Sequence, residues 1–421
     1  MDSIRVEGGV ALCGEVPISG AKNAVLPALC ATLLASGRHT LSHVPMLRDV
    51  RTTRALLEHL GCRVEREADR LEVEVGASIH SEAPYALVKK MRASILVLGP
   101  LVARLGRARV SLPGGCAIGA RPIDQHLKGL KAMGATVHLA HGYVQVEVPR
   151  GRLRGADIRF ATPTVTGTEN LLCAAALAVG RTRLIGAARE PEVQDLGRAL
   201  QQMGAKISGL GTDLITIDGV EGLTPMQHRV IPDRIEAGTF AVAAALTGGE
   251  VVLQGVRACD LDAVSAKLRE AGVEIAMDGE NMQVRGRPPF RATDLSTAPF
   301  PGFPTDMQAQ FMVLMCRAEG RSALTETIFE NRFMHVPELG RMGADIRVEG
   351  RTAMINGVAS LQGAPVMATD LRASASLLLA ALVAEGESEL RRVYHIDRGY
   401  ERIEAKLSAL GARVCRVVGD A

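Results

Sequence analysis

The sequence contains no tryptophan and only 3% aromatic residues. Proteins that bind nucleic acids usually carry a basic stripe interleaved with aromatic residues that stack on bases. Here the 49 basic and 46 acidic residues are scattered and leave a net charge of only +3. The composition therefore disfavours nucleic acid as a partner.

Long apolar runs are lacking as well. No stretch approaches the roughly 20 apolar residues that span a bilayer. The first residues, MDSIRVEGGV, have neither the basic nor the apolar region of a signal peptide. We therefore expect no membrane association and a cytoplasmic location.

The eight cysteines form no C-x-x-C pair and have no histidine cluster near them. This spacing argues against a zinc site and a disulfide framework, and it fits a reducing compartment. Cys30, Cys173 and Cys316 lie in apolar helical stretches, where we expect core residues. Cys116 differs, because LPGGCAIGARPIDQ is too rich in glycine and proline for a helix or strand. It is either an exposed cysteine without a role, or a thiol that a mobile loop and Arg121 bring over a bound anion.

Two signatures alternate six times along the 421 residues, a length that itself favours at least two domains. One is a helix that ends at a glycine before a strand, as in LKAMGATVHL, since glycine suits the left-handed conformation that closes a helix. The other is an alanine-rich helix, as in ENLLCAAALAVG, for which we expect a buried, central position. The pattern predicts an α/β fold of six repeated units, three per domain. The repeated glycines are Gly61, Gly134, Gly204, Gly272, Gly343 and Gly411.

The sixth unit stops before its final strand, and the N-terminal segment IRVEGGVALCGEVPISG resembles the missing piece. We therefore expect the N-terminal strand to complete the C-terminal domain. This gives a discontinuous domain I of residues 1–20 and 232–421. Domain II then spans residues 21–231 and carries the Cys116 loop.

Polar residues stand where each alanine-rich helix should begin. Free N–H groups at helix starts attract anions, so two such rims would form a cleft for phosphates or carboxylates. Ordinary capping is the alternative at each single position. Asp306 is thus either an N-cap or a base, and Arg398 either a surface residue or an anion ligand. The residues at the helix starts are Lys22 with Asn23, Arg92 with Ser94, Thr168 to Asn170, Arg234 with Glu236, Asp306 with Gln308, and Arg372 with Ser374.

A set of motifs between residues 19 and 407 resembles the enolpyruvyl transferases, and within them the UDP-N-acetylglucosamine 1-carboxyvinyltransferases. The motifs are SGAKNAVLPAL, MRAS, LPGGCAIGARPIDQH, REPEVQDL, PDRIEAGTF, FPTDMQAQF, TIFENRFMHVPEL, DLRASAS and HIDRGYERIEAKL. The resemblance implies a two-domain inside-out α/β barrel that needs no metal or organic cofactor. It also implies transfer of enolpyruvate from phosphoenolpyruvate to the 3-hydroxyl of UDP-N-acetylglucosamine, with release of phosphate, at the opening of bacterial peptidoglycan synthesis.

The same resemblance implies a role for individual residues. Cys116 is similar to the family's proton donor to C3 of phosphoenolpyruvate, and is the position that fosfomycin would alkylate. Asp306 resembles the base near the sugar 3-hydroxyl. The implied ligands of phosphoenolpyruvate are Lys22, Asn23, Arg121 and Arg398. Those of UDP-N-acetylglucosamine are Arg92, Arg121, Pro122, Ile123, Asp124, Gln125, Thr164, Val165, Thr166, Asp306 and Ile328, with Arg332, Asp370 and Arg372 supporting the cleft.

One segment departs from the family pattern, since ATPTVTGTENL replaces a Ser-Val-Gly form near the nucleotide phosphates. The contacts of Thr164, Val165 and Thr166 to the diphosphate are therefore in doubt. Two other functions stay open. One is transfer of enolpyruvate to shikimate 3-phosphate on the same fold, which would not need Cys116. The other is a non-catalytic paralogue that binds a nucleotide sugar.

Overall fold

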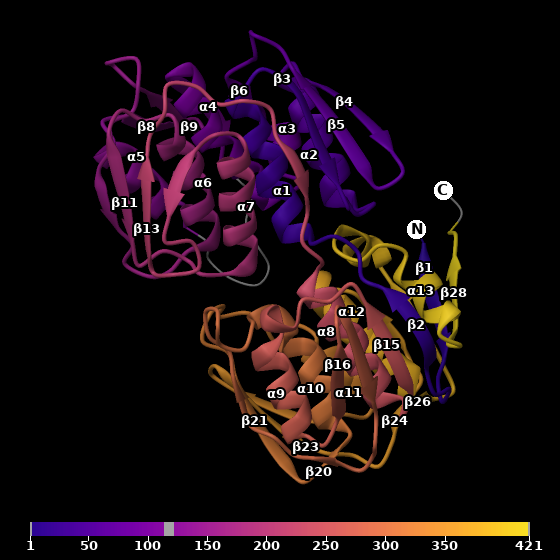
Figure 1. Cartoon of the computed structure of the whole chain (residues 1–421). Coiled ribbons are helices and arrows are strands. Elements are labelled where there is room, and N and C mark those ends of the chain that lie inside the picture. Colours follow the sequence, from indigo (N-terminus) through magenta and orange to yellow (C-terminus); the bar gives the residue numbers. More distant parts are fainter. Residues whose placement is uncertain (1, 113–121, 420–421) are drawn as a thin grey trace. The chain divides into compact units, whose positions relative to one another are not determined.

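The computed structural model describes residues 2–112 and 122–419 (Figure 1). Contacts between Cα atoms divide them into two compact units, each built around a hydrophobic core of its own. Unit 1 comprises residues 2–19 and 232–419, and unit 2 comprises residues 20–112 and 122–231. Each unit holds three four-stranded sheets. The first strand of every such sheet is parallel to the second, and the second, third and fourth are successively antiparallel.

Unit 2 contains the first three sheets. In spatial order they are β14 (Gln227–Arg229), β3 (Gly37–Ser42), β5 (Arg70–Val75) and β4 (Arg63–Glu67); β6 (Glu82–Ala83), β7 (Arg107–Ser111), β9 (Tyr143–Glu147) and β8 (Thr136–Ala140); and β10 (Asp157–Arg159), β11 (Arg181–Ile185), β13 (Leu214–Asp218) and β12 (Lys206–Ser208). Its buried helices are α1 (Lys22–Ala31), α4 (Leu98–Leu105) and α6 (Val165–Ala176). Its other helices are η1 (Thr32–Leu34), α2 (Arg48–His59), α3 (Tyr85–Val88), η2 (Arg92–Val97), α5 (Asp124–Ala132) and α7 (Pro191–Gln202).

Unit 1 repeats this plan. Its sheets are β2 (Cys13–Pro17), β15 (Glu250–Gln254), β17 (Asn281–Arg285) and β16 (Glu274–Asp278); β19 (Leu295–Ser296), β21 (Arg321–Thr325), β23 (Thr352–Asn356) and β22 (Asp345–Glu349); and β25 (Pro365–Met367), β27 (Glu387–Arg391), β1 (Ser3–Glu7) and β28 (Arg413–Val417). Two short pairs join β18 (Phe290–Arg291) to β20 (Ala318–Glu319) and β24 (Leu361–Gln362) to β26 (Ala384–Glu385). The buried helices are α8 (Arg234–Leu246), α10 (Gln308–Cys316) and α12 (Leu371–Val383). The others are η3 (Ala258–Asp260), α9 (Asp262–Glu270), η4 (Thr305–Met307), α11 (Val336–Arg341), η5 (Val393–Arg398) and α13 (Ile403–Ala409).

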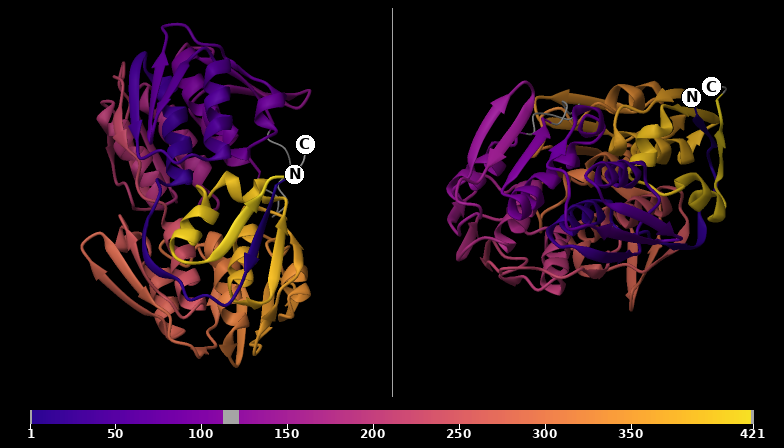
Figure 2. Two further views of the ribbon diagram at one scale, coloured as in Figure 1. Left: turned by 90° about the vertical axis from the view of Figure 1, so that its right-hand side faces the viewer. Right: turned by 90° about the horizontal axis from the view of Figure 1, so that it is seen from above.

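The N-terminal strand completes the last sheet, as the sequence predicts. β1 lies between β27 and β28 and is antiparallel to both, with Ile4 opposite Leu390 on one side and Arg416 on the other. Figure 2 shows this indigo strand among the yellow C-terminal ones. In the two preceding sheets of unit 1 the third strand comes from the unit's own hairpin, whereas here the chain start provides it. β2 then pairs in parallel with β15 in the fourth sheet.

The two repeated sequence signatures have the predicted structures. All six repeated glycines have φ between 88° and 103°, a left-handed conformation that closes each outer helix before its strand. The alanine-rich stretches form buried helices, and Cys30, Cys173 and Cys316 are buried within them. Among the described residues, none of the helices combines the length and apolarity needed to cross a membrane.

Candidate functional site

In unit 1, the N-terminal halves of three buried helices lie together. Gln310, in the first turn of α10, donates from Nε2 to Thr239 Oγ1 of α8 at 3.1 Å and to the Asp306 carbonyl at 3.0 Å. Asp233 caps α8, and Asp370 caps α12 by accepting from the N–H groups of Arg372 and Ala373 at 2.9 and 3.1 Å. The polar ends of separate sequence repeats thus meet at one place.

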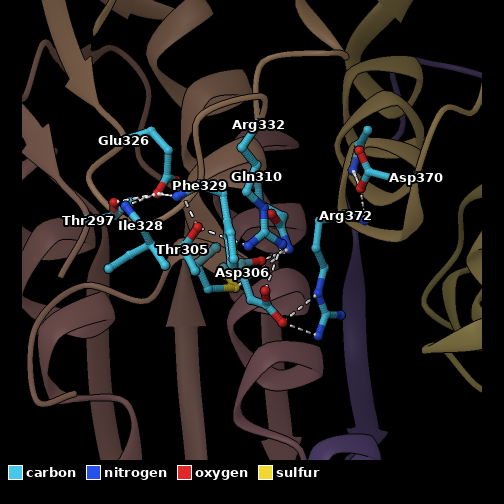
Figure 3. Close-up of polar contacts among 12 residues, drawn as sticks. Thr297, Thr305, Asp306, Gln310, Glu326, Ile328, Phe329, Arg332, Asp370 and Arg372 are labelled. Atoms are coloured by element: carbon cyan, nitrogen blue, oxygen red, sulfur yellow. Dashed lines mark hydrogen bonds and ion pairs between the residues drawn. The ribbon is translucent and has the colours of Figure 1, made fainter. Parts of the chain in front are cut away.

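Asp306 lies at the centre of this place (Figure 3). Its Oδ1 accepts from Arg332 Nη2 at 2.7 Å, and its Oδ2 accepts from Arg372 Nη2 at 2.8 Å and Nε at 3.1 Å. The side chain of Asp306 is 25% exposed, whereas those of Arg332 and Arg372 are 5% and 4% exposed. The capping alternative for Asp306 is wrong, because neither η4 nor α10 has a side-chain cap.

Electrostatics keep the triad of Asp306, Arg332 and Arg372 ionised. Burial by itself raises the pKa of Asp306, but the guanidinium groups of Arg372 and Arg332 outweigh burial and hold that pKa well below its usual value. Burial lowers the pKa of Arg372, but Asp306, Tyr400 and Asp233 together outweigh burial and raise that pKa above its usual value. Two guanidinium groups and one carboxylate give these three side chains, taken by themselves, a net charge of +1. The Arg372 guanidinium is also buried against Tyr400, with its central carbon 5.4 Å from the centre of that ring.

A second carboxylate, Glu326, lies to one side of the triad and is linked to it through Thr305 (Figure 3). Its Oε2 accepts from the Thr305 hydroxyl at 2.8 Å, and Thr305 in turn accepts from Arg332 Nη1 at 2.9 Å. Its Oε1 accepts from the N–H of Ile328 at 2.8 Å, which ties that predicted ligand to the triad. Sequence reasoning missed Glu326, whose only signal is an acidic residue directly after an alternating strand.

In unit 2, the structure corrects one predicted helix start. Helix α6 begins at Val165, with the Thr164 side chain accepting from Gly167 N at 3.2 Å. Thr168, Glu169 and Asn170 therefore lie inside the helix and are buried, rather than at its opening. Burial and the charges of Glu192 and Glu190 raise the pKa of Glu169 well above its usual value, so it is no part of a cationic rim.

Asn170 joins the starts of three elements of unit 2. Its Nδ2 lies 3.0 Å from His126 Nδ1 in α5 and donates to the Ile95 carbonyl in η2 at 3.1 Å. Thr166 Oγ1 lies 3.3 Å from His126 Nε2, and Gln125 accepts from Ala161 N at 2.8 Å. Burial, then the charge of Arg92, lower the pKa of His126 to about 4. His126 is a further residue that the sequence did not single out, since a lone histidine in an amphipathic helix carries no signal.

The remaining predicted residues fall into four groups. Lys22, the first residue of α1, is buried and pairs through Nζ with Asp49 Oδ2 at 2.8 Å, and Asn23 beside it is half-buried. Arg398 ends η5 and is half-buried. Cys116 and Arg121 lie outside the described residues. The segment that follows them has Pro122 and Asp124 exposed and Ile123 packed against the core of unit 2.

The described residues offer no preformed metal centre. Across residues 2–112 and 122–419, no three histidine, cysteine, aspartate or glutamate side chains are grouped to hold an ion. The charged groups described above are an ammonium group with a carboxylate partner in unit 2 and two guanidinium groups with a carboxylate partner in unit 1. Such groups hold anionic ligands through charge-assisted hydrogen bonds.

Comparison with known proteins gives relatives over the whole chain. It is 62% identical over 422 residues to a UDP-N-acetylglucosamine 1-carboxyvinyltransferase of Sorangium cellulosum (strain So ce56), covering 100% of this chain and 99% of that one. It is 58% identical to a protein of the same name from Myxococcus xanthus (strain DK1622), covering 99% of each chain.

Solved structures agree with this relationship. The enolpyruvyl transferase NikO from Streptomyces tendae superposes with a TM-score of 0.89 at 26% identity, covering 100% of this chain and 99% of that one, and so confirms the predicted fold. EPSP synthase from Acinetobacter baumannii shares the fold with a TM-score of 0.75 at 19% identity, over 100% of both chains. The model of the family EPSP synthase (3-phosphoshikimate 1-carboxyvinyltransferase) matches residues 6–407. The chain therefore belongs to this family of enolpyruvyl transferases, as its motifs predict.

Proposed function

We propose that this protein transfers the enolpyruvyl group of phosphoenolpyruvate to the 3-hydroxyl of UDP-N-acetylglucosamine and releases phosphate. The observation that carries the proposal is 62% identity, from end to end, with a relative named for this reaction. The buried guanidinium groups around Asp306 support it, because both substrates are anionic. By the same relationship, the reaction opens bacterial peptidoglycan synthesis in the cytoplasm.

The chemistry is an addition followed by an elimination. Cys116 gives a proton to C3 of phosphoenolpyruvate, C2 becomes electrophilic, and the sugar hydroxyl oxygen adds to C2. The resulting tetrahedral ketal then loses a proton from C3 as its C2–O bond to phosphate breaks. A positioned general acid of this kind contributes roughly 10²–10⁴-fold. Fosfomycin would alkylate the same thiol.

The proposal assigns anion ligands to both units. Lys22, Asn23, Arg121 and Arg398 bind phosphoenolpyruvate. Arg332 and Arg372 add two buried guanidinium groups, and Asp370 fixes the start of the helix that carries Arg372. Residues assigned to UDP-N-acetylglucosamine are Arg92, Pro122, Ile123, Asp124, Gln125, Thr164, Val165, Thr166 and Ile328, together with Arg121 and Asp306.

Asp306 accepts a hydrogen bond from the sugar 3-hydroxyl. A carboxylate whose pKa is held low by two guanidinium groups is a weak base, so it does not ionise a free alcohol. It takes the proton only as the C2–O bond forms, when that hydroxyl becomes strongly acidic. Its first task is therefore to orient the oxygen that attacks C2.

Phosphate release from phosphoenolpyruvate tests the proposal. We expect release by the purified protein with UDP-N-acetylglucosamine, and none without an acceptor or with Cys116→Ser. Release that requires shikimate 3-phosphate and persists in Cys116→Ser would identify the sister reaction instead. Nucleotide-sugar binding without any release would identify a non-catalytic paralogue.

A further inference from the structure

Glu326 is the most enclosed acidic group near the site, with 0% of its surface exposed. It follows β21 directly and is reached by four hydrogen bonds (Figure 3). Oε1 accepts from Thr297 Oγ1 at 2.9 Å and from the N–H groups of Ile328 and Phe329 at 2.8 and 3.1 Å. Oε2 accepts from Thr305 Oγ1 at 2.8 Å. Every contact thus presents a hydrogen to the carboxylate.

One of these contacts continues to Asp306. Thr305 accepts from Arg332 Nη1 at 2.9 Å, and this leaves the single hydroxyl hydrogen of Thr305 directed at Glu326. The other terminal nitrogen of Arg332 donates to Asp306 Oδ1 at 2.7 Å. Glu326 therefore fixes the polarity of Thr305, Thr305 fixes the plane of the Arg332 guanidinium, and Arg332 fixes one oxygen of Asp306.

The other contacts hold the chain that carries Ile328. With the N–H groups of Ile328 and Phe329 turned onto Oε1, the segment after β21 is pinned to the same carboxylate. The centre of the Phe329 ring lies 5.4 Å from the Arg332 guanidinium carbon, so this segment also contacts Arg332. One buried group thus organises a predicted sugar contact and the orienting carboxylate.

The fold itself does not need a carboxylate at this position. The second strand of each of the six four-stranded sheets corresponds to β21, and the residue after it can be compared. The residues that follow the other five strands are His43, Leu112, Gly186, Gly255 and Arg392, none of them acidic. Five of the six repeats therefore have no acidic residue at this position. The repeat that carries β21 has one, and it lies beside Asp306.

We propose that Glu326 is a positioning residue that sets, through Thr305 and Arg332, the orientation of Asp306 for attack on C2, and holds Ile328 against the nucleotide sugar. This inference rests on the proposed function. It predicts that mutation can separate two arms of contacts. The Thr305 arm runs from Glu326 through Thr305 and Arg332 to Asp306 and affects turnover. The Ile328 arm runs from Glu326 to the N–H groups of Ile328 and Phe329 and affects the affinity for the nucleotide sugar.

Thr305→Val removes the hydroxyl and keeps the shape and the Ile328 arm. Glu326→Gln keeps an acceptor for the two N–H groups but turns an NH₂ donor toward Thr305, so that Thr305 loses its acceptor. For both we expect kcat to fall about 10–100-fold, since small misplacements of reacting groups have effects of this size. The KM values for both substrates should change by less than about 3-fold. Glu326→Ala should lower kcat similarly and also raise the KM for UDP-N-acetylglucosamine.

Thr325→Val is the matched control. Thr325 precedes Glu326 on the same strand and bonds Thr352 Oγ1 at 2.9 Å, away from Asp306. Its variant should match wild-type kcat and KM. Wild-type kcat in both Thr305→Val and Glu326→Gln would overturn the inference, and these two variants decide it if Glu326→Ala fails to fold.

A crystal structure of Thr305→Val makes the test independent of turnover. We expect the Arg332 guanidinium to rotate away from Asp306 Oδ1, with no such change in Thr325→Val. An unmoved Arg332 would overturn the positioning role even if the protein catalyses the proposed reaction. A rotated Arg332 in a protein without transferase activity would instead refute the proposed function alone.

Discussion

Asp306 neutralises part of the charge of two buried arginines, so its removal should cost stability as well as activity. Asp306→Asn keeps the shape but removes the carboxylate with which the guanidinium groups of Arg332 and Arg372 are paired. We expect the free energy of unfolding to fall by about 3 kcal/mol, within the range for breaking a buried ion pair. Urea titration measures this, with Glu349→Ala, in the exposed pair with Arg347, as a control that should have no measurable effect.

The stabilisation by Asp306 has a definite pH dependence. Its folded-state pKa lies below the unfolded value of about 3.9, so the stabilisation is present above that pH and is lost as the pH falls toward the folded pKa. The stability difference between wild type and Asp306→Asn should therefore be constant above about pH 4 and shrink below it. A difference that grows on acidification would contradict the ionised triad.

His126 shows a pH dependence of the same sign, in a higher pH range. Its folded-state pKa is about 4, so between about pH 6.5 and 4 the unfolded chain binds a proton that the folded protein does not. As the pH falls through this window, the free energy of unfolding should decrease by up to roughly 3 kcal/mol. His126→Gln should reduce this slope, and His335, whose pKa burial also lowers to about 4, should account for much of what remains. His138→Gln on the exposed strand β8 should leave the slope unchanged. Equal slopes in the two variants, measured by urea unfolding at several pH values, would argue against a buried neutral His126.

At this scale the sequence predicts residue types better than it predicts contacts. Asp306, Arg332 and Arg372 were all singled out from motifs, but their pairing joins residues 26 and 66 positions apart. No local spacing encodes such contacts, because they depend on how separate repeats pack. Glu326 was missed for the same reason, since its role follows from Thr305 and Ile328, which lie on two different segments.

Among the helices, α12 has a cap that determines where the helix begins, and so where it places Arg372. Asp370 satisfies two N–H groups of the first turn, so Asp370→Ala should lower the free energy of unfolding by about 1 kcal/mol or somewhat more. Asp370→Ser, which can still cap, should retain most of that stability. Thermal or urea unfolding compares the two variants. Equal losses in both would show that Asp370 acts through its charge and not through its cap.

Element types were predictable, and some boundaries were not. Glycine at the end of six outer helices and alanine in six buried ones are local signals, and both gave the observed structures. The start of α6 was placed too late, because the prediction followed the polar run Thr168 to Asn170. Thr164 is the true cap, and the polar residues after it are buried to join α5 and η2.

At the scale of the molecule, the repeat count explains why the chain start lies beside the chain end. Five of the six repeats form the third strand of their sheet from their own hairpin, and in the sixth repeat β1 from the chain start is the third strand. The incomplete sixth repeat made this closure predictable from sequence. Unit 1 and unit 2 have separate hydrophobic cores, so a destabilising substitution in β1 should affect unit 1 alone.

Ile4 and Glu7 of β1 allow a matched test of that closure. Ile4 is fully buried between β27 and β28, whereas Glu7 forms an exposed ion pair with Arg413. Ile4→Ala should lower the stability of unit 1 by about 3 kcal/mol, as for other large-to-small core substitutions, and Glu7→Ala should be near neutral. Hydrogen exchange should then show lost protection in β27 and β28 and none in the strands of unit 2. Loss spread equally over both units would mean that they unfold as one cooperative body, and unchanged protection would mean that β1 adds little to the sheet it completes.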